Sequence, residues 1–90
     1  MNNKTTEQPD NEEIFEYLRT QGYNFPEVRS AMFTLNKKRI PELARRIGVS
    51  RMTVYNVLNG TSDNLDVIRG FSKEFNIDAT KAFSDILKFN

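Results

Sequence analysis

The segment "IPELARRIGVSRMTVYNVLNG", residues 40–60, predicts two short helices joined by a turn at Gly48-Val49-Ser50. Pro41 is tolerated in the first turn of the first helix because a proline there gives up no intrahelical hydrogen bond. The Ser50 side chain suits the N-cap of the second helix. We therefore expect the second helix to cover residues 50–58, with Gly60 as its stop.

The second of these helices has two faces of opposite character. Its inner face is apolar and consists of Val54, Val57 and Leu58. Its outer face holds a cation, an amide and two large side chains, namely Arg51, Asn56, Met52 and Tyr55. The outer face carries no acidic residue, so it suits a negatively charged partner.

The spacing of small and apolar residues in this segment meets the steric requirements of a helix-turn-helix. The first helix needs a small residue where the second crosses it, and Ala44 occupies that position. The turn needs a residue that adopts positive φ easily, and Gly48 follows four residues later. Val49 is placed to plug the turn into the core, and Leu43 and Ile47 complete the inner face of the first helix.

The stretch "LARRIGVSRMTVYNVLNG" resembles the helix-turn-helix of bacterial and phage repressors, both of the Cro/lambda-repressor-like group and of the lactose-repressor headpiece. A preceding helix with the apolar stripe Val28, Met32 and Leu35 favours the former group. The following "SDNLDVIRGFSKEFNID" also resembles the next helix of Cro-like domains. The resemblance covers residues 25–78 and implies an all-α, five- to six-helix lambda-repressor-like DNA-binding domain. The chain departs from that pattern at Pro41, where Cro-like domains often place a glutamine, and by an extra N-terminal helix.

The resemblance implies that residues 50–58 form a recognition helix that lies in the major groove. Arg51 has the donors to bind guanine and Asn56 the groups to bind adenine, while Met52 and Tyr55 can contact a thymine methyl group. Tyr55 packing on a neighbouring helix is the alternative. The remaining candidate DNA contacts lie in and around the motif, namely Ser50, Thr53, Lys37, Lys38, Arg39, Asn59 and Thr61. Ser50 caps the helix in either case.

Outside the motif, apolar residues at helical spacing predict further helices in residues 10–21, 24–38, 61–78 and 78–90. Asp10 caps the first, Ser62 or Asp63 the third and Asp78 the last. The expected inward positions are Ile14, Phe15, Leu18, Val28, Met32, Leu35, Leu65, Ile68, Phe71, Phe75, Ile77, Phe83, Ile86 and Leu87. We interpret Glu12, Glu13 and Glu16 as a solvated face. Residues 1–9 are polar and predict a disordered tail, which leaves residues 10–90 as a single helix-turn-helix domain.

The net charge of the 90-residue chain is only +1, but the basic residues cluster. Residues 28–60 contain a single acid, Glu42. The basic residues of the same segment are Arg29, Lys37, Lys38, Arg39, Arg45, Arg46 and Arg51. Such a block attracts a polyanion even when the whole chain is nearly neutral. The alternative is a solvated basic face without a partner.

The composition argues against several classes of function. The chain has no Cys and no His, so it offers no disulfide, thiolate nucleophile, imidazole base or zinc site of the usual kind. It has no apolar run of the roughly 20 residues that span a bilayer, and its N-terminus lacks the apolar stretch of a signal peptide. We therefore expect a cytoplasmic protein that is not an enzyme, does not bind a membrane and needs no cofactor, metal or small-molecule ligand.

These observations predict a protein that binds double-stranded DNA in a sequence-specific way. We expect a transcriptional repressor that covers its operator as a homodimer. The apolar face of Phe83, Ile86 and Leu87 and that of the first helix are candidate dimer surfaces, unless each packs onto the core of its own chain. Two alternatives use the same scaffold: an antitoxin that binds both DNA and a toxin, and a module that binds protein only.

Overall fold

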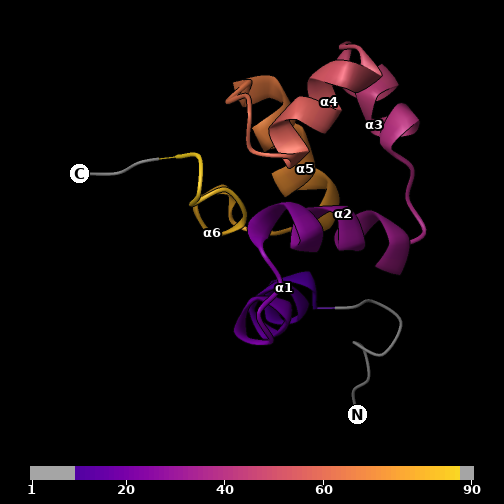
Figure 1. Cartoon of the computed structure of the whole chain (residues 1–90). Coiled ribbons are helices and arrows are strands. Elements are labelled where there is room, and N and C mark those ends of the chain that lie inside the picture. The colour runs from indigo at the N-terminus through magenta and orange to yellow at the C-terminus, as the bar shows by residue number, and fades with distance from the viewer. Residues whose placement is uncertain (1–9, 88–90) are drawn as a thin grey trace.

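The computed structural model describes residues 10–87, and these residues form six helices and no strand (Figure 1). The helices are α1 (Asn11–Thr20), α2 (Phe25–Leu35), α3 (Ile40–Ile47), α4 (Arg51–Leu58), α5 (Leu65–Phe75) and α6 (Ala79–Ala82). The predicted all-α class is confirmed. The predicted disorder of residues 1–9 falls outside the described residues.

Side-chain caps begin most of the helices, because the first backbone N–H groups of a helix have no partner inside it. The Asp10 carboxylate accepts a hydrogen bond from the N–H of Glu13 at 3.2 Å, and Asn24 forms a capping box with Glu27 at the start of α2. The prediction for α5 was wrong by one or two residues. Its cap is Asn64, whose Oδ1 accepts from the N–H of Val67 at 3.2 Å.

One cluster of buried apolar side chains joins all six helices. Phe71 of α5 lies at its centre and contacts three other phenylalanines, Phe33 of α2, Phe75 of α5 and Phe83 after α6. The ring centroids of Phe71 and Phe83 are 5.2 Å apart and the two rings meet edge to face. This arrangement is favourable beyond the burial of area alone.

Two predicted core residues are exposed. Leu35, the last residue of α2, is 54% exposed, and Leu65, the first residue of α5, is 53% exposed. The spacing of Val28, Met32 and Leu35 fits a helical stripe, but Met32 and Phe33 face the core, and Leu35 lies at the edge of a surface groove. Both errors fall at helix ends, where the stripe leaves the packed region.

The C-terminal helix is shorter than predicted, since α6 ends at Ala82 and the chain continues as a turn. Phe83 is nevertheless fully buried, and Ile86 and Leu87 pack partly buried against the core. Of the two predicted alternatives for this face, packing onto the core of the same chain is therefore the one observed. Phe15 of α1 is likewise buried.

Helix α1 packs against α2, which separates it from α4 (Figure 1). Its acidic residues are not simply a solvated face, as the sequence suggested. Glu12 accepts a hydrogen bond from the N–H of Asp78 at 2.9 Å, and Lys81 of α6 lies 3.2 Å from the Glu16 carboxylate and 3.5 Å from that of Glu12. These carboxylates therefore help to dock α1 onto the start of α6.

Candidate nucleic-acid interface

The turn between α3 and α4 has the geometry that the sequence predicts. Gly48 has φ +90°, in the left-handed region that glycine adopts without strain. The N–H groups of Gly48 and Val49 donate to the Ala44 carbonyl at 2.8 and 3.0 Å, which satisfies one of the last carbonyls of α3. Ala44 is 2% exposed at the place where the two helices meet. Residues 40–58 therefore fold as two short helices joined by a tight turn.

Helix α3 is in turn seated on α5 by a close approach between two side-chain positions. A Cβ atom placed on Gly70 of α5 would lie only 2.6 Å from Cδ1 of Ile47. The missing side chain at Gly70 therefore provides the space that Ile47 occupies. The contact fixes the first helix of the motif on the body of the domain.

The apolar face of α4 is completely packed and its polar face is open. Val54 and Val57 are 0% exposed and Leu58 is 1% exposed. On the other side Met52 is 65% exposed and Tyr55 is 44% exposed, so the Tyr55 ring is only partly packed against its neighbours. Burial of three side chains on one face holds the helix rigidly while the opposite face meets solvent.

Arg51 and Asn56, the two residues best suited to read bases, are free for a ligand. Arg51 is exposed, and within residues 10–87 it makes no ion pair. Asn56 is half-buried, and its side-chain amide has no hydrogen-bond partner in the same part of the chain. Arg51 therefore keeps the two donors, and Asn56 the donor and acceptor, that bidentate base recognition requires.

Ser50 caps α4 as predicted and also contacts Thr53. Its Oγ accepts from the N–H of Thr53 at 3.1 Å and lies 2.9 Å from the Thr53 hydroxyl. Only one of the two hydroxyl hydrogens is needed to bridge these oxygens. The other hydroxyl can therefore donate to an anion at the N-terminus of α4, where the helix dipole also favours negative charge.

The predicted basic contacts before α3 lie apart from the start of α4. Lys37, Lys38 and Arg39 precede the N-terminus of α3, whereas α4 begins beyond its C-terminus, about 12 Å further along an eight-residue helix. The ammonium group of Lys38 is 2.8 Å from a carboxylate oxygen of Glu74. Lys38 is therefore already paired, while Lys37 and Arg39 are exposed.

The basic block of residues 28–60 is smaller on the surface than in the sequence. Arg29 is fully buried, and Arg46 pairs with Glu74 as Lys38 does. The cations of this block that make no ion pair among the described residues are Lys37, Arg39, Arg45 and Arg51. Lys38 and Arg46 share the one carboxylate of Glu74, so this exposed group also keeps a net positive charge.

At the far end of α4, Asn59 and Thr61 differ in what they can offer a phosphate. Both the N–H and the hydroxyl of Thr61 donate to the Asn56 carbonyl, at 2.9 and 3.0 Å. Thr61 would therefore have to give up an internal hydrogen bond to donate to DNA. Asn59 is exposed, and among residues 10–87 its side chain makes no hydrogen bond. Asn59 is the better placed of the two.

The structure also reveals a feature that the sequence pattern did not indicate, an ion pair between Arg29 and Asp85 beside the end of α4. The two residues are 56 positions apart, and Arg29 sits among apolar residues of α2 that give no hint of its partner. The one signal in the sequence for a buried pair was Arg29 itself, a basic residue at a position of α2 where the helical spacing places a core side chain.

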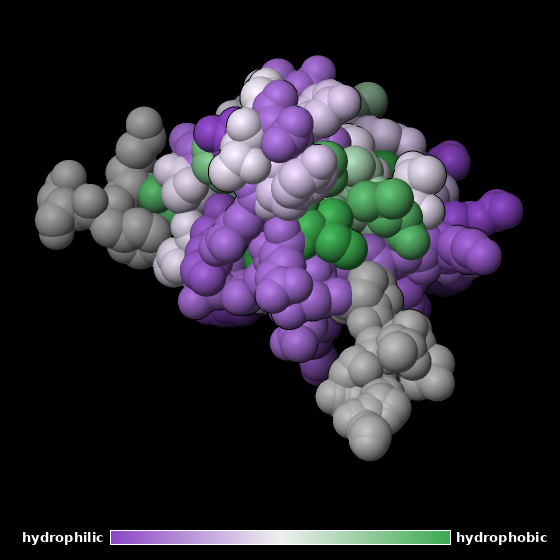
Figure 2. All heavy atoms as spheres, turned by 90° about the horizontal axis from the view of Figure 1, so that it is seen from below, coloured by the Kyte–Doolittle hydropathy of each residue, from purple (hydrophilic) through white to green (hydrophobic). Residues whose placement is uncertain are grey.

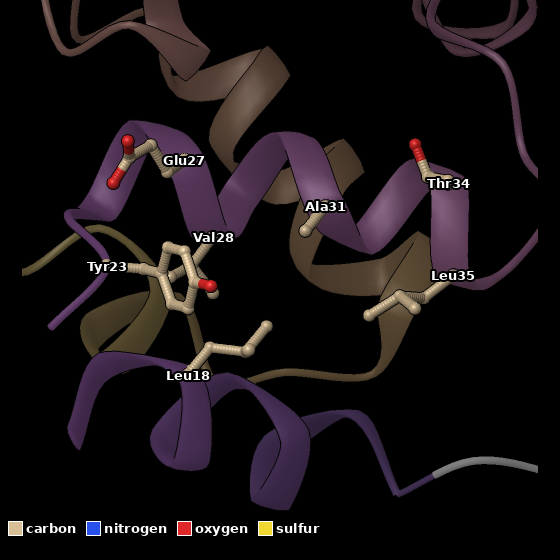
Figure 3. Close-up of a pocket in the computed structure, with 7 residues that line it drawn as sticks. All are labelled: Leu18, Tyr23, Glu27, Val28, Ala31, Thr34 and Leu35. Atoms are coloured by element: carbon tan, nitrogen blue, oxygen red, sulfur yellow. The ribbon is translucent and has the colours of Figure 1, made fainter. Parts of the chain in front are cut away.

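A surface groove of about 460 Å³ lies between α1 and α2 (Figure 3). Its apolar lining comes from Leu18, Tyr23, Val28, Ala31 and Leu35. Tyr23 is 51% exposed, about as much as Leu35. Seen from the α1 side, the molecule shows apolar atoms gathered in a patch bordered by hydrophilic ones (Figure 2). The groove lies on the side of α2 that faces α1.

Comparison with known proteins gave no match to any protein-family model, any curated protein or any solved structure. No helix among residues 10–87 is long and apolar enough to cross a membrane.

Proposed function

We propose that this chain is a sequence-specific DNA-binding protein that places α4 in the major groove of double-stranded DNA. The observation that carries the proposal is the contrast between the two faces of α4. Its apolar face is fully buried, whereas the side chains of the other face make no ion pair or hydrogen bond within residues 10–87, namely Arg51, Met52, Tyr55 and Asn56. An α-helix with its side chains is about 10–12 Å across and therefore fits the major groove, which is about 12 Å wide.

Three further features support this proposal. The sequence of residues 40–60 resembles the helix-turn-helix of Cro/lambda-repressor-like regulators, and we propose the same domain type here. The Ser50–Thr53 hydroxyl pair leaves a donor at the N-terminus of α4, where a phosphate is favoured. Arg45 and Arg51 add positive charge on the motif itself without a counter-charge among the described residues.

We further propose that the protein acts as a homodimeric transcriptional repressor by occupying its operator. Two recognition helices about 34 Å apart read half-sites one helical turn apart. The α1–α2 groove exposes the apolar side chains of Tyr23 and Leu35, and α1 lies on the side of α2 away from α4 (Figure 1). A second copy seated there would leave α4 uncovered. The proposed dimer therefore uses the groove rather than Phe83 or Phe15, which the core already buries.

Selection from a pool of random duplexes tests the proposal, followed by binding to the enriched duplex at several salt concentrations. We expect an inverted repeat, with an affinity that falls as salt rises because phosphate contacts release counterions. Arg51→Ala and Asn56→Ala should relax the selected sequence. A pool without enrichment, combined with no binding at low salt, would contradict the proposal and favour a module that binds protein only.

A further inference from the structure

Arg29 is the one charged residue of the described chain that is fully buried, and it makes four hydrogen bonds. Its Nε donates to the Leu58 carbonyl at 3.1 Å, and its Nη1 donates to the Ala82 carbonyl at 2.8 Å. Nη1 and Nη2 also hold the two carboxylate oxygens of Asp85, at 2.7 and 2.9 Å. Four of the five guanidinium hydrogens therefore have acceptors.

These hydrogen bonds join three segments that are far apart in the sequence. Arg29 lies in the middle of α2, Leu58 is the last residue of α4, and Asp85 lies in the turn that follows α6. The Phe83 ring packs against the guanidinium, with its centroid 4.8 Å from Cζ. A planar, bidentate pair of this kind sets direction as well as distance, which a lysine could not reproduce.

The contact with Leu58 falls at the end of α4, where helix carbonyls lack partners inside the helix. A cation at that end is also favoured by the helix dipole. The chain leaves α4 through Asn59 and Gly60, and a Cβ atom placed on Gly60 would lie 3.3 Å from the Asp85 carboxylate. The ion pair therefore lies directly against the exit from α4.

We infer that Arg29 and Asp85 are positioning residues for α4, fixing its C-terminal end and so the direction in which its outer face meets DNA. The turn that carries Asp85 is then part of the recognition apparatus although it touches no DNA. The inference rests on the proposed function for its DNA consequence, but its structural half stands on the contacts alone.

The two ends of α4 are held by different groups, which makes a local effect measurable. The start is fixed by Ser50, whose Oγ accepts from the N–H of Thr53 at 3.1 Å and whose carbonyl accepts from the N–H of Val54 at 3.3 Å. At the other end the N–H groups of Asn59, Gly60 and Thr61 donate back to carbonyls of α4. Recognition sites lose function when their supporting contacts let them shift by about 0.5 Å. Loosening one end of α4 is therefore sufficient to lower the affinity for DNA.

Amide hydrogen exchange in Asp85→Asn tests whether the Arg29–Asp85 pair fixes the C-terminal end of α4. This variant keeps the shape of the side chain and one acceptor oxygen but removes the charge that pairs with Arg29. We expect protection of the Asn59, Gly60 and Thr61 amides to fall at least about tenfold more than that of the Thr53 and Val54 amides at the start of α4. Equal loss at both ends of α4, or no loss at either, would overturn the inference.

A measurement on the unmodified protein decides the matter if Asp85→Asn does not fold. The Nε–H of Arg29 should exchange slowly and show scalar coupling to the Leu58 carbonyl carbon across their hydrogen bond. A rapidly exchanging Nε–H without that coupling would contradict the inference.

The consequence for DNA binding is tested by comparing the affinities of Asp85→Asn and Asp66→Asn. The second variant is the control and removes an exposed carboxylate from α5. We expect affinity for the selected duplex to fall about tenfold in Asp85→Asn, at a temperature where both variants are folded, and to stay unchanged in Asp66→Asn. Unchanged affinity in Asp85→Asn would refute the positioning role. If the wild-type chain binds no duplex, the proposed function fails, while the exchange experiment still decides whether the pair fixes α4.

Discussion

Single residues decide how the first helix of the motif sits on the domain, and Gly70 is the clearest example. Gly70 belongs to α5, and Ile47 of α3 occupies the space where its side chain would be. A glycine inside a helix lowers helix stability by about 1 kcal/mol relative to alanine, so helix propensity does not explain a glycine at position 70. The close helix contact accounts for it.

Gly70→Ala should therefore lower the free energy of unfolding when residue 47 is isoleucine and raise it when residue 47 is alanine. In the wild-type background we expect a loss of about 1 kcal/mol, because overpacking outweighs the gain in helix propensity. In an Ile47→Ala background, where both clashing atoms are gone, the same change should stabilise by about 0.5–1 kcal/mol. Denaturant unfolding of the four proteins in this double-mutant cycle measures both values. Equal effects in the two backgrounds would show that the helices do not meet at this point.

At the scale of elements, the cap of α4 connects stability with the proposed interface. Ser50→Asp keeps a strong N-cap, since aspartate caps helices about as well as serine. It also places a negative charge where a phosphate is expected. We predict unfolding free energy within about 0.5 kcal/mol of wild type together with a clear fall in DNA affinity. Ser50→Asn, a cap without charge, is the control and should keep more of the affinity. Unimpaired DNA binding by Ser50→Asp would place the phosphates elsewhere.

The cap of α6 gives a prediction about pH. The hydroxyl and N–H of Thr80 both donate to the Asp78 carboxylate, with Lys81 also nearby, and hold its pKa below the ordinary value. A depressed folded-state pKa contributes stability above the unfolded-state pKa, and that stability is lost as pH falls through the folded-state value. Thr80→Val should raise the pKa of Asp78 in an NMR titration, whereas Thr34→Val, which removes an exposed hydroxyl from the last turn of α2, should leave it unchanged. If Thr80→Val left the pKa of Asp78 unchanged, the cap would not form in solution.

Sequence signals located the elements because helix starts and turns are local. Asp10, Ser50 and Asp78 are caps as predicted, and Gly48 adopts the positive φ that the turn requires. The last helix was predicted too long, because the spacing of Phe83, Ile86 and Leu87 fits a helix as well as it fits the turn that they form. Periodicity reports which side chains are apolar, not which backbone brings them to the core.

At the scale of the whole molecule, the features that the sequence did not predict are long-range contacts. Arg29 was counted among the basic residues of the surface, yet it is buried and paired with Asp85 across 56 positions. Lys38 and Arg46 likewise share Glu74 of α5. No local pattern pairs such residues, because their proximity follows from packing. The outer face of α4 was easier to predict, since its residues are neighbours on one helix.

The proposed dimer interface can be tested by substituting two leucines that are about equally exposed, one inside the groove and one outside it. Leu35 lies in the α1–α2 groove and is 54% exposed, while Leu65 lies outside it and is 53% exposed. Leu35→Ser should weaken the dimer, seen as a shift to monomer in sedimentation equilibrium at micromolar concentration, because an apolar contact is lost. Leu65→Ser should keep the wild-type association. The same association in both variants would remove the groove from the interface.

The central claim, that the outer face of α4 reads DNA sequence, is tested most directly by the specificity of Arg51→Ala. The quantity is the ratio of affinities for the selected duplex and a scrambled one, compared among wild type, Arg51→Ala and Arg69→Ala. Arg69 is a matched control, since it is exposed on α5 and likewise makes no ion pair among residues 10–87. The account predicts that Arg51→Ala lowers this ratio by about tenfold or more while Arg69→Ala leaves it unchanged. Equal ratios in the two variants would contradict it.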